Sequence, residues 1–132
     1  MVVKGFTFSF GALYGDNSIE CTSGNITIEN CVFTQTGSDS DCGAISFGSS
    51  HGIINNSRIE NMSECFFGAL YVYNSNVELD HFSIINTNGS SHIIYSQDSQ
   101  IDMNFVTLSG NSVDEDYSII RMYDGSELNV IN

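Results

Sequence analysis

The 132-residue chain lacks proline and has only three basic residues, Lys4, Arg58 and Arg121, against 16 acidic ones. Its formal net charge is therefore −13. Proteins that bind nucleic acid hold the phosphate backbone with clustered Lys and Arg, so this composition argues against nucleic acid as a partner. It disfavours an anionic membrane surface for the same reason. A high negative charge instead favours solubility and is compatible with cation binding.

Long apolar runs and helical periodicity are also absent. Because no stretch of 18 apolar residues exists, no membrane span is predicted. No window shows the i, i+3, i+4, i+7 pattern of an amphipathic helix. The apolar start could be mistaken for a signal peptide, but Phe6, Phe8 and Phe10 alternate with polar residues, which is typical of a strand.

The chain instead contains a repeat of about 25 residues, clearest between Gly68 and His92. Each repeat holds three short apolar runs with period-two alternation, the pattern of strands buried on one side. Aligned repeats form four apolar columns: Leu70 with Leu13, Ile45, Ile94 and Ile120; Val77 with Ile26, Gly52, Ile101 and Leu128; Leu79 with Ile28, Ile54, Met103 and Val130; Ile84 with Phe33, Ile59 and Leu108.

Repeats of this length indicate a stack in which each unit buries its face only against its neighbours. Three strands per repeat and no helix predict one all-β domain over residues 1–132, a parallel β-helix of about five coils. The first full coil is expected to open at Gly11–Tyr14 and to carry an insertion from Gly15 to Gly24. Both ends lie within a coil, so we expect a truncated piece of a longer solenoid whose uncapped ends associate.

Two polar columns are expected at the corners of the coil. The corner between the second and third strands has two residues each time: Glu29-Asn30, Asn55-Asn56, Asp80-His81 and Asn104-Phe105. Such a corner needs a residue that tolerates positive φ, which Asn and Asp do best after Gly. A second column, Ser50, Ser75, Ser99 and Ser126, precedes the second strand and is expected to form a hydroxyl ladder.

The openings GALY and GAIS, followed by ITIENCVF and VELDHFSI, resemble the parallel β-helix repeats of polymorphic-membrane-protein-type surface proteins. That family carries repeated GGAI and FxxN motifs and belongs to the wider pectin-lyase-like fold, a right-handed, single-stranded parallel β-helix. The resemblance implies an extracellular or cell-surface location and a repetitive region used for adhesion.

Tyrosines are expected to gather on one outer face. If Leu70 and Val72 point inward, their neighbours in the strand must point outward. The outward columns then hold Tyr14, Tyr71, Tyr73, Tyr95, Tyr123 and Arg121. Exposed aromatic rings can stack on sugars or pack on another protein. The alternative is a cross-strand ladder that only stabilises the sheet.

Glu78 and Asp102 share another outward column, flanked by Asp80. Two carboxylates about 5 Å apart match the spacing of retaining glycosidases, and they could equally form part of a calcium site. A solvated acidic face is the third and favoured interpretation, since no substrate-positioning groups accompany the pair. The histidines lie at turns without ligand spacing, so neither a metal nor a cofactor is predicted.

The four cysteines lie in the first half of the chain. Cys31 aligns with inward positions and is expected in the core as a free thiol. Cys42 and Cys65 occupy the same loop in adjacent coils, which makes them candidates for a disulfide, with Cys21 as a rival partner.

Two classes of function remain. The favoured one is a non-catalytic module of a surface protein, a rigid spacer or adhesin whose tyrosine face contacts glycan or protein. The alternative is a fragment of a polysaccharide-degrading β-helix enzyme, a lyase or glycoside hydrolase. Lyases of this fold use a basic residue beside a carboxylate cluster, and Arg58 and Arg121 fall on different faces. The convergent cluster that would favour an enzyme is therefore not apparent.

Overall fold

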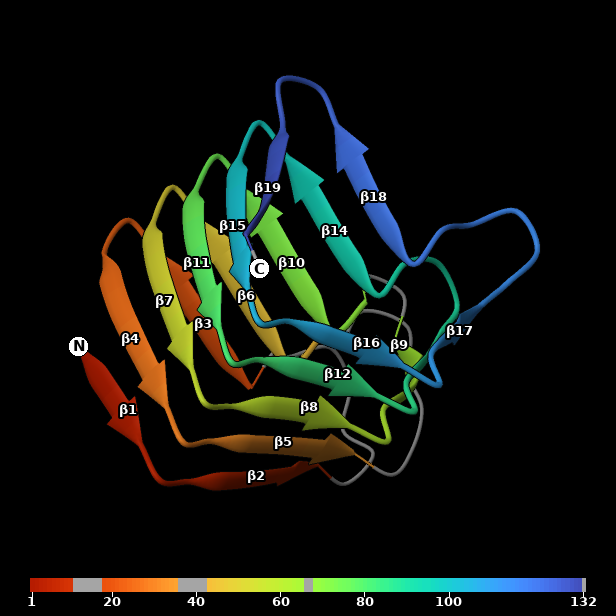
Figure 1. The fold of residues 1–132 in the computed structure, drawn as a ribbon, viewed down its shortest axis with the longest axis horizontal. Coiled ribbons are helices and arrows are strands. Elements are labelled where there is room, and N and C mark those ends of the chain that lie inside the picture. Colours follow the sequence, from red (N-terminus) through yellow and green to blue (C-terminus); the bar gives the residue numbers. More distant parts are fainter. Residues whose placement is uncertain (11–17, 36–42, 66–67, 132) are drawn as a thin grey trace.

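The computed structural model describes residues 1–10, 18–35, 43–65 and 68–131, and these residues form a parallel β-solenoid (Figure 1). All strand pairs in the described residues are parallel, and no helix occurs among them. The chain makes about four turns of roughly 25 residues. The predicted all-β parallel coil is thus confirmed.

Three large sheets form the walls of the solenoid. Sheet I contains β1 (Val2–Lys4), β4 (Asn25–Glu29), β7 (His51–Asn55), β11 (Asn76–Asp80), β15 (Gln100–Asn104) and β19 (Glu127–Ile131). Sheet II contains β3 (Ile19–Thr22), β6 (Ile45–Gly48), β10 (Leu70–Tyr73), β14 (Ile94–Gln97) and β18 (Ile120–Tyr123). Sheet III contains β2 (Thr7–Phe10), β5 (Val32–Gln35), β8 (Arg58–Glu60), β12 (Ser83–Ile85) and β16 (Thr107–Ser109).

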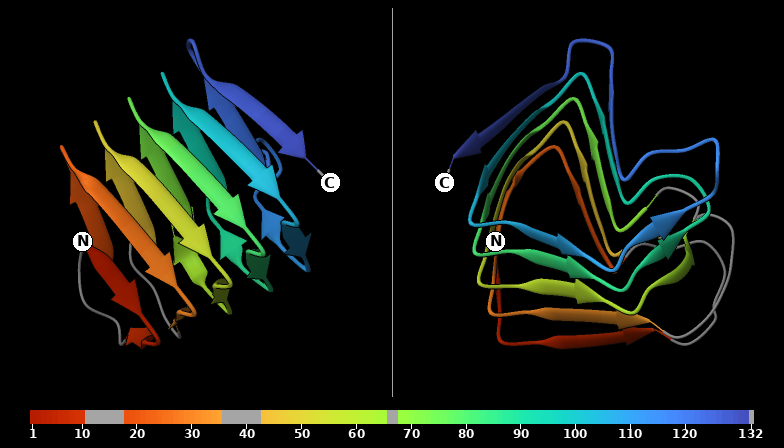
Figure 2. Two further views of the ribbon diagram at one scale, coloured as in Figure 1. Left: turned by 60° about the vertical axis from the view of Figure 1, so that its left-hand side comes forward. Right: turned by 45° about the vertical axis from the view of Figure 1, so that its right-hand side comes forward.

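A fourth, short sheet, which the sequence analysis did not predict, lies at the corner between sheets III and II (Figure 2). It contains β9 (Ser63–Cys65), β13 (Asn88–Gly89) and β17 (Ser112–Val113). These strands have only two or three residues, and their sequences show too little alternation to be recognised as strands. No helix in the described part of the chain has the length and apolar content of a membrane span.

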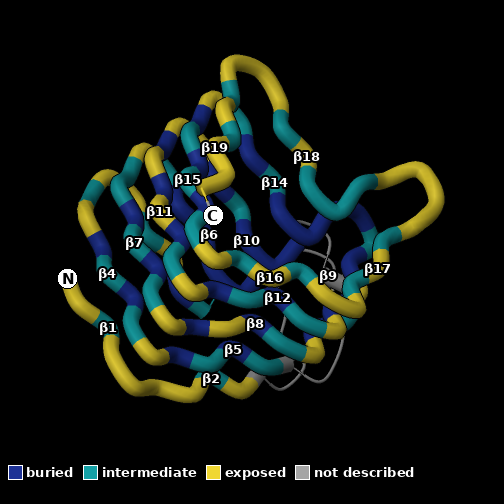
Figure 3. The backbone as a smooth tube through the Cα atoms, in the orientation of Figure 1, coloured by how far each residue is buried: buried dark blue, intermediate teal, exposed yellow. Residues whose placement is uncertain are grey.

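The core is a set of apolar columns that run along the solenoid. Strand registers place Val77 between Gly52 and Ile101, and Leu79 between Ile54 and Met103, as the repeat predicts. Leu70 and Ile84 are likewise paired with their predicted neighbours, and both are fully buried. Figure 3 shows the alternation of buried and exposed positions along the central strands. Burial decreases towards the two ends of the stack.

The first coil differs from its prediction. Ile19, not Leu13, lies beside Ile45 in sheet II, so β3 falls inside the stretch expected to be an insertion. The reason is spacing: seven residues separate Ile19 from Ile26, as seven separate Leu70 from Val77. The GALY motif at residues 11–14 drew the prediction to the wrong apolar run. Leu13 and Tyr14 lie outside the described residues.

The corners follow the predicted backbone chemistry. The second residue of each corner pair between sheets I and III has positive φ, at Asn30 (52°), Asn56 (47°), His81 (48°) and Phe105 (51°). The serine column forms the expected ladder, because the amide of Ser75 donates to the Ser99 hydroxyl at 3.0 Å and the amide of Ser50 donates to the Ser75 hydroxyl at 2.9 Å.

Candidate functional site

The outer face of sheet II carries the predicted tyrosines of β10, β14 and β18. In the first outward column, Tyr71 lies between Ser46 and Tyr95, and Arg121 follows Tyr95. The Tyr71 and Tyr95 rings are stacked, with centroids 5.2 Å apart and planes 10° apart. Both rings are half-buried, which fits a cross-strand ladder, one of the two predicted roles.

The second outward column is the more exposed one. It runs Gly48, Tyr73, Gln97, Tyr123, with the two tyrosines 43% and 45% exposed. A side chain built at Gly48 would meet nothing within 4 Å, so the space beside Tyr73 is open. Two strand spacings, about 10 Å, separate Tyr73 from Tyr123. This column offers two exposed rings with an amide between them, an arrangement suited to contact with a polar, flat ligand.

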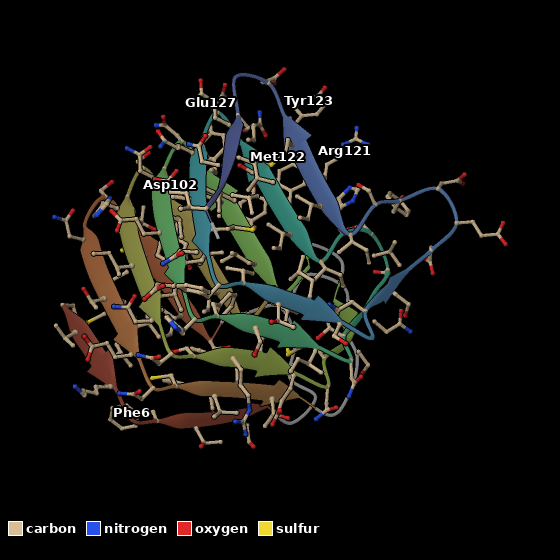
Figure 4. The ribbon with its side chains drawn as sticks, in the orientation of Figure 1. Phe6, Asp102, Arg121, Met122, Tyr123 and Glu127 are labelled. Carbon is tan, nitrogen blue, oxygen red and sulfur yellow. The ribbon has the colours of Figure 1, made fainter. Side chains whose placement is uncertain are left out.

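Polar groups frame these rings at the last turn of the solenoid. The Arg121 guanidinium carbon lies 5.7 Å from the centre of the Tyr123 ring, and the two side chains project outward from β18 (Figure 4). The Tyr95 hydroxyl donates to Gln97 Oε1 at 3.3 Å. Burial, followed by the proximity of Tyr95 and then Tyr73, raises the pKa of the Tyr71 hydroxyl.

Two further aromatic residues, which the sequence analysis did not single out, adjoin the face. The Tyr117 ring meets the His92 ring edge-on at 5.2 Å, and His92 lies 5.9 Å from Tyr95. His92 is buried, and its Nδ1 lies 3.1 Å from the Ser118 carbonyl oxygen. Tyr117 lies in the turn before β18, where no strand alternation reveals its direction. At the other end of the tyrosine column, Glu20 stands where Tyr14 was expected.

The acidic residues lie on a different wall, the outer face of sheet I. Glu78 and Asp102 are neighbours in adjacent strands, as predicted, and Asp80 is two residues from Glu78. With Ile53, Asn55, Asn104 and Ile131 they line a shallow groove of about 530 Å³. Figure 4 shows Asp102 on β15, on a different sheet from Arg121 and Tyr123. The groove and the tyrosine columns are therefore separate candidate sites.

The Asp102 carboxylate accepts hydrogen bonds from neighbouring amides within sheet I. The Gln100 amide donates to both Asp102 oxygens at 3.0 and 3.2 Å, and Asn129 donates to Asp102 Oδ1 at 2.8 Å. These donors, Gln100 first and then Asn129, hold the pKa of Asp102 below its usual range. A general acid of a glycosidase needs a raised pKa. Asp102 is therefore suited to remain a carboxylate and not to donate a proton.

Glu78 and Asp80 on this face have histidine or amide neighbours. Glu78 Oε1 lies 3.8 Å from His51 Nε2. Asp80 Oδ1 lies 3.0 Å from His81 Nδ1 and accepts from Asn104 at 2.7 Å. Among the residues that the structure describes, no three His, Cys, Asp or Glu side chains are grouped as metal ligands. The arrangement is that of a hydrogen-bonded polar surface.

Of the four cysteines, the structure describes the side chains of Cys21 and Cys31. Cys31 is buried and free, as predicted, with Sγ 3.3 Å from the Glu29 carbonyl oxygen. Cys21 is a half-buried free thiol. Cys42 and the Cys65 side chain lie outside the described part of the structure, so their disulfide remains a prediction.

The fold and the surface define the class of protein: a parallel β-solenoid with an aromatic column on one wall and an acidic groove on another. Comparison of the chain with known protein families, curated proteins and solved structures finds no match.

Proposed function

We propose that this chain is a non-catalytic module of an extracellular or cell-surface protein, a rigid spacer or adhesin that contacts glycan or protein through sheet II. The proposal adopts the right-handed, pectin-lyase-like architecture and the surface role that the resemblance to polymorphic-membrane-protein-type repeats implies. The observation that carries it is the column of Tyr73, Gln97 and Tyr123 beside the open space at Gly48.

The chemistry of this column suits weak, repeated contacts. Two exposed rings bury modest apolar area, roughly 1–2 kcal/mol each against a ligand. Gln97 supplies an amide donor and an amide acceptor between them. Useful affinity would then come from several copies displayed together. Tyr14, which was predicted to belong to the face, lies outside the described residues.

Tyr73 and Tyr123, the two most exposed tyrosines of sheet II, give the most direct test of this proposal. Tyr73→Ser with Tyr123→Ser should abolish binding of a multivalent form of the chain to a glycan array or to cell surfaces. Tyr71→Ser with Tyr95→Ser should weaken binding too, with a loss of stability because these rings are stacked. Phe105→Ser is the matched control, since Phe105 is 56% exposed but lies at the corner between sheets I and III. Unchanged binding by the Tyr73/Tyr123 variant would exclude this face.

The second candidate function is degradation of a polysaccharide in the acidic groove. The pairing of Glu78 with Asp102 favours it. Such an activity should disappear in Glu78→Gln and persist in the Tyr73/Tyr123 double variant. Cleavage of an acidic or neutral polysaccharide with that pattern would replace the adhesin proposal.

A further inference from the structure

The corner between sheets II and I carries a column of polar side chains along one edge of the solenoid (Figure 1). One residue of each coil has positive φ there: Ser23 (57°), Ser49 (51°), Asn74 (47°), Asp98 (49°) and Asp124 (38°). Backbone hydrogen bonds stack these corners, as the Ser49 amide donates to the Tyr73 carbonyl at 3.0 Å. Every member of the column has a side-chain oxygen, and Ser49, Asn74 and Asp98 are exposed.

The middle of this column borders a hollow of about 320 Å³. Its lining residues all have polar side chains, and they are Ser49, Ser50, Asn74, Ser75, Asn76 and Asp98. The hollow lies beside the ends of β6, β10 and β14, and β3 and β18 flank these strands on either side in sheet II. The hollow is therefore a feature of the interior of the stack.

Two of the lining side chains have hydrogen-bonding groups that the protein does not use. The Asn74 amide nitrogen donates to the Ser49 hydroxyl at 3.1 Å, so the Asn74 Oδ1 atom points away from Ser49 as an acceptor. Within the described part of the chain, no group donates to the Asp98 carboxylate. Asp102 in sheet I, by contrast, accepts from Gln100 and Asn129. Asp98 is thus available to accept hydrogen bonds from a ligand.

The hollow adjoins the exposed tyrosine column, because each coil supplies one residue to both. Gly48 precedes Ser49, Tyr73 precedes Asn74, and Gln97 precedes Asp98. Gly48 and Tyr73 are neighbours in adjacent strands, and the space beside Gly48 is open. A ring that occupied this space would lie one strand spacing, about 4.8 Å, from the backbone position of Tyr73. Its edge would then reach the corner hollow.

The chemistry of the lining selects one kind of occupant. Sites for hydrophobic small molecules are lined mainly by apolar side chains, and protein interfaces are anchored by apolar and aromatic groups in dry pockets. The residues that line this hollow are all polar. None of them is basic, and Asp98 would repel a carboxylate or sulfate group. A neutral sugar has an apolar C–H face for Tyr73 and hydroxyl donors for Asn74 and Asp98.

We propose that the hollow of Ser49, Asn74 and Asp98, together with the open space between Gly48 and Tyr73, binds a pyranose ring of a neutral glycan. The sugar ring stacks on Tyr73, and its hydroxyls donate to Asn74 Oδ1 and to the Asp98 carboxylate. The site rests on the proposed function, since it belongs to the same tyrosine face, and it narrows the partner from glycan or protein to neutral glycan.

The test uses the full 132-residue chain displayed on streptavidin and an array of neutral oligosaccharides with their sialylated and sulfated counterparts. The wild type should bind neutral members in preference to acidic ones. Asn74→Gly and Asp98→Gly should each raise the half-saturating concentration about tenfold, because each removes a hydrogen bond to the sugar. Glycine suits the positive φ of both positions, so the backbone is retained.

Asn56→Gly is the matched control. Asn56 is also exposed and also has a φ of 47°, but it lies at the corner between sheets I and III, so binding should not change.

Gly48→Val gives a second test that does not depend on lost hydrogen bonds. A Cβ at Gly48 meets nothing within 4 Å, so the valine should leave the thermal midpoint unchanged or higher. It fills the space beside Tyr73, and it should therefore weaken glycan binding at least tenfold.

The outcomes separate this site from the broader proposal. If Tyr73→Ser with Tyr123→Ser abolishes glycan binding while Asn74→Gly, Asp98→Gly and Gly48→Val bind as the wild type does, the tyrosine face stands and the corner site is wrong. A preference for acidic glycans would also overturn the site, as would binding to cell-surface protein with no glycan bound. Absence of any binding by the wild type would overturn both proposals.

Discussion

At the residue scale, Gly52 shows how the core accommodates a glycine in a column of larger apolar side chains. Gly52 stands in the column of Ile26, Val77 and Ile101, where every other described member is a larger apolar residue. The fully buried Phe47 ring fills the space: a Cβ built on Gly52 would lie 2.6 Å from Phe47 Cζ. Gly52 and Phe47 thus form one compensating pair in a close-packed core.

The first prediction is that Gly52→Val, although it restores the column, destabilises the protein. Overpacking against Phe47 should lower the free energy of unfolding by about 1–3 kcal/mol in urea titrations. Combining it with Phe47→Val should recover part of this loss, because the valine then enters the vacated space. A stabilising Gly52→Val would show that the ring does not occupy that space.

The second prediction concerns Asp102 and pH. Its pKa is lowered in the folded state by Gln100 and Asn129. A lowered pKa contributes stability above the unfolded value, about 4, and this contribution is lost as pH falls through the folded value. The difference in unfolding free energy between wild type and Asp102→Asn should therefore shrink on acidification below about pH 4. Gln100→Leu should reduce this pH dependence, and a pH-independent difference would contradict the assignment.

At the scale of the element, the serine ladder links each coil to the next. The hydroxyls of Ser75 and Ser99 each accept from a backbone amide of the previous coil and donate to a carbonyl two residues earlier, as Ser99 does to Gln97 at 2.6 Å. Ser75 and Ser99 are both buried, so their partners cannot be replaced by water. The ladder makes the corner between sheets II and I a continuous hydrogen-bonded edge.

The third prediction follows from this chain of hydrogen bonds. Ser99→Ala leaves the buried Ser75 amide without its acceptor, and it should cost about 1–3 kcal/mol of unfolding free energy in thermal or urea titrations. Ser126→Ala should cost less, because the Ser99 amide lies 3.3 Å from that hydroxyl and Ser126 is less buried. Ser49→Ala, at an exposed corner position, is the control. Equal losses at positions 49 and 99 would refute the ladder as a source of stability.

At the scale of the whole molecule, charge is the dominant property. Three basic residues balance few of the 16 acidic ones, so self-repulsion opposes the compact state. The walls differ in how they handle this charge. In sheet I, Glu29 pairs with Lys4 at 2.8 Å and Asp102 accepts hydrogen bonds from Gln100 and Asn129, whereas the turn at residues 114–116 carries three exposed acids.

The fourth prediction is that salt stabilises the protein. Screening of the repulsion should raise the unfolding midpoint by several degrees when sodium chloride is added to a low-salt buffer, as measured by circular dichroism. Glu115→Lys, which lowers the net charge in the exposed turn, should raise the midpoint at low salt and have a smaller effect at high salt. A midpoint that falls with salt would contradict the repulsion argument.

The coil, its period and most of its apolar columns could be predicted from local sequence patterns. Strand alternation and the spacing of seven residues between the first and second strands, which becomes eight only in the last coil, are local properties, so Leu70, Val77 and Ile84 could be placed from the sequence. The corners were equally legible, because only a few residue types tolerate positive φ. Even so, the chain places His81 and Phe105 in that conformation, since the stacked neighbours impose the corner on them.

Two features depend on contacts between coils and could not be predicted locally. They are the apolar run that forms the first described strand of sheet II and the side chains that meet between adjacent coils. Ile19 replaced Leu13 because a strand must pair in register with Ile45, a constraint that no local motif reveals. The exposure of Tyr73 and the hydrogen-bond donors around Asp102 depend on neighbours about 25 residues away in the sequence. The space beside Gly52 is filled by Phe47, which belongs to a different sheet. Packing between distant residues, not local alternation, sets these properties.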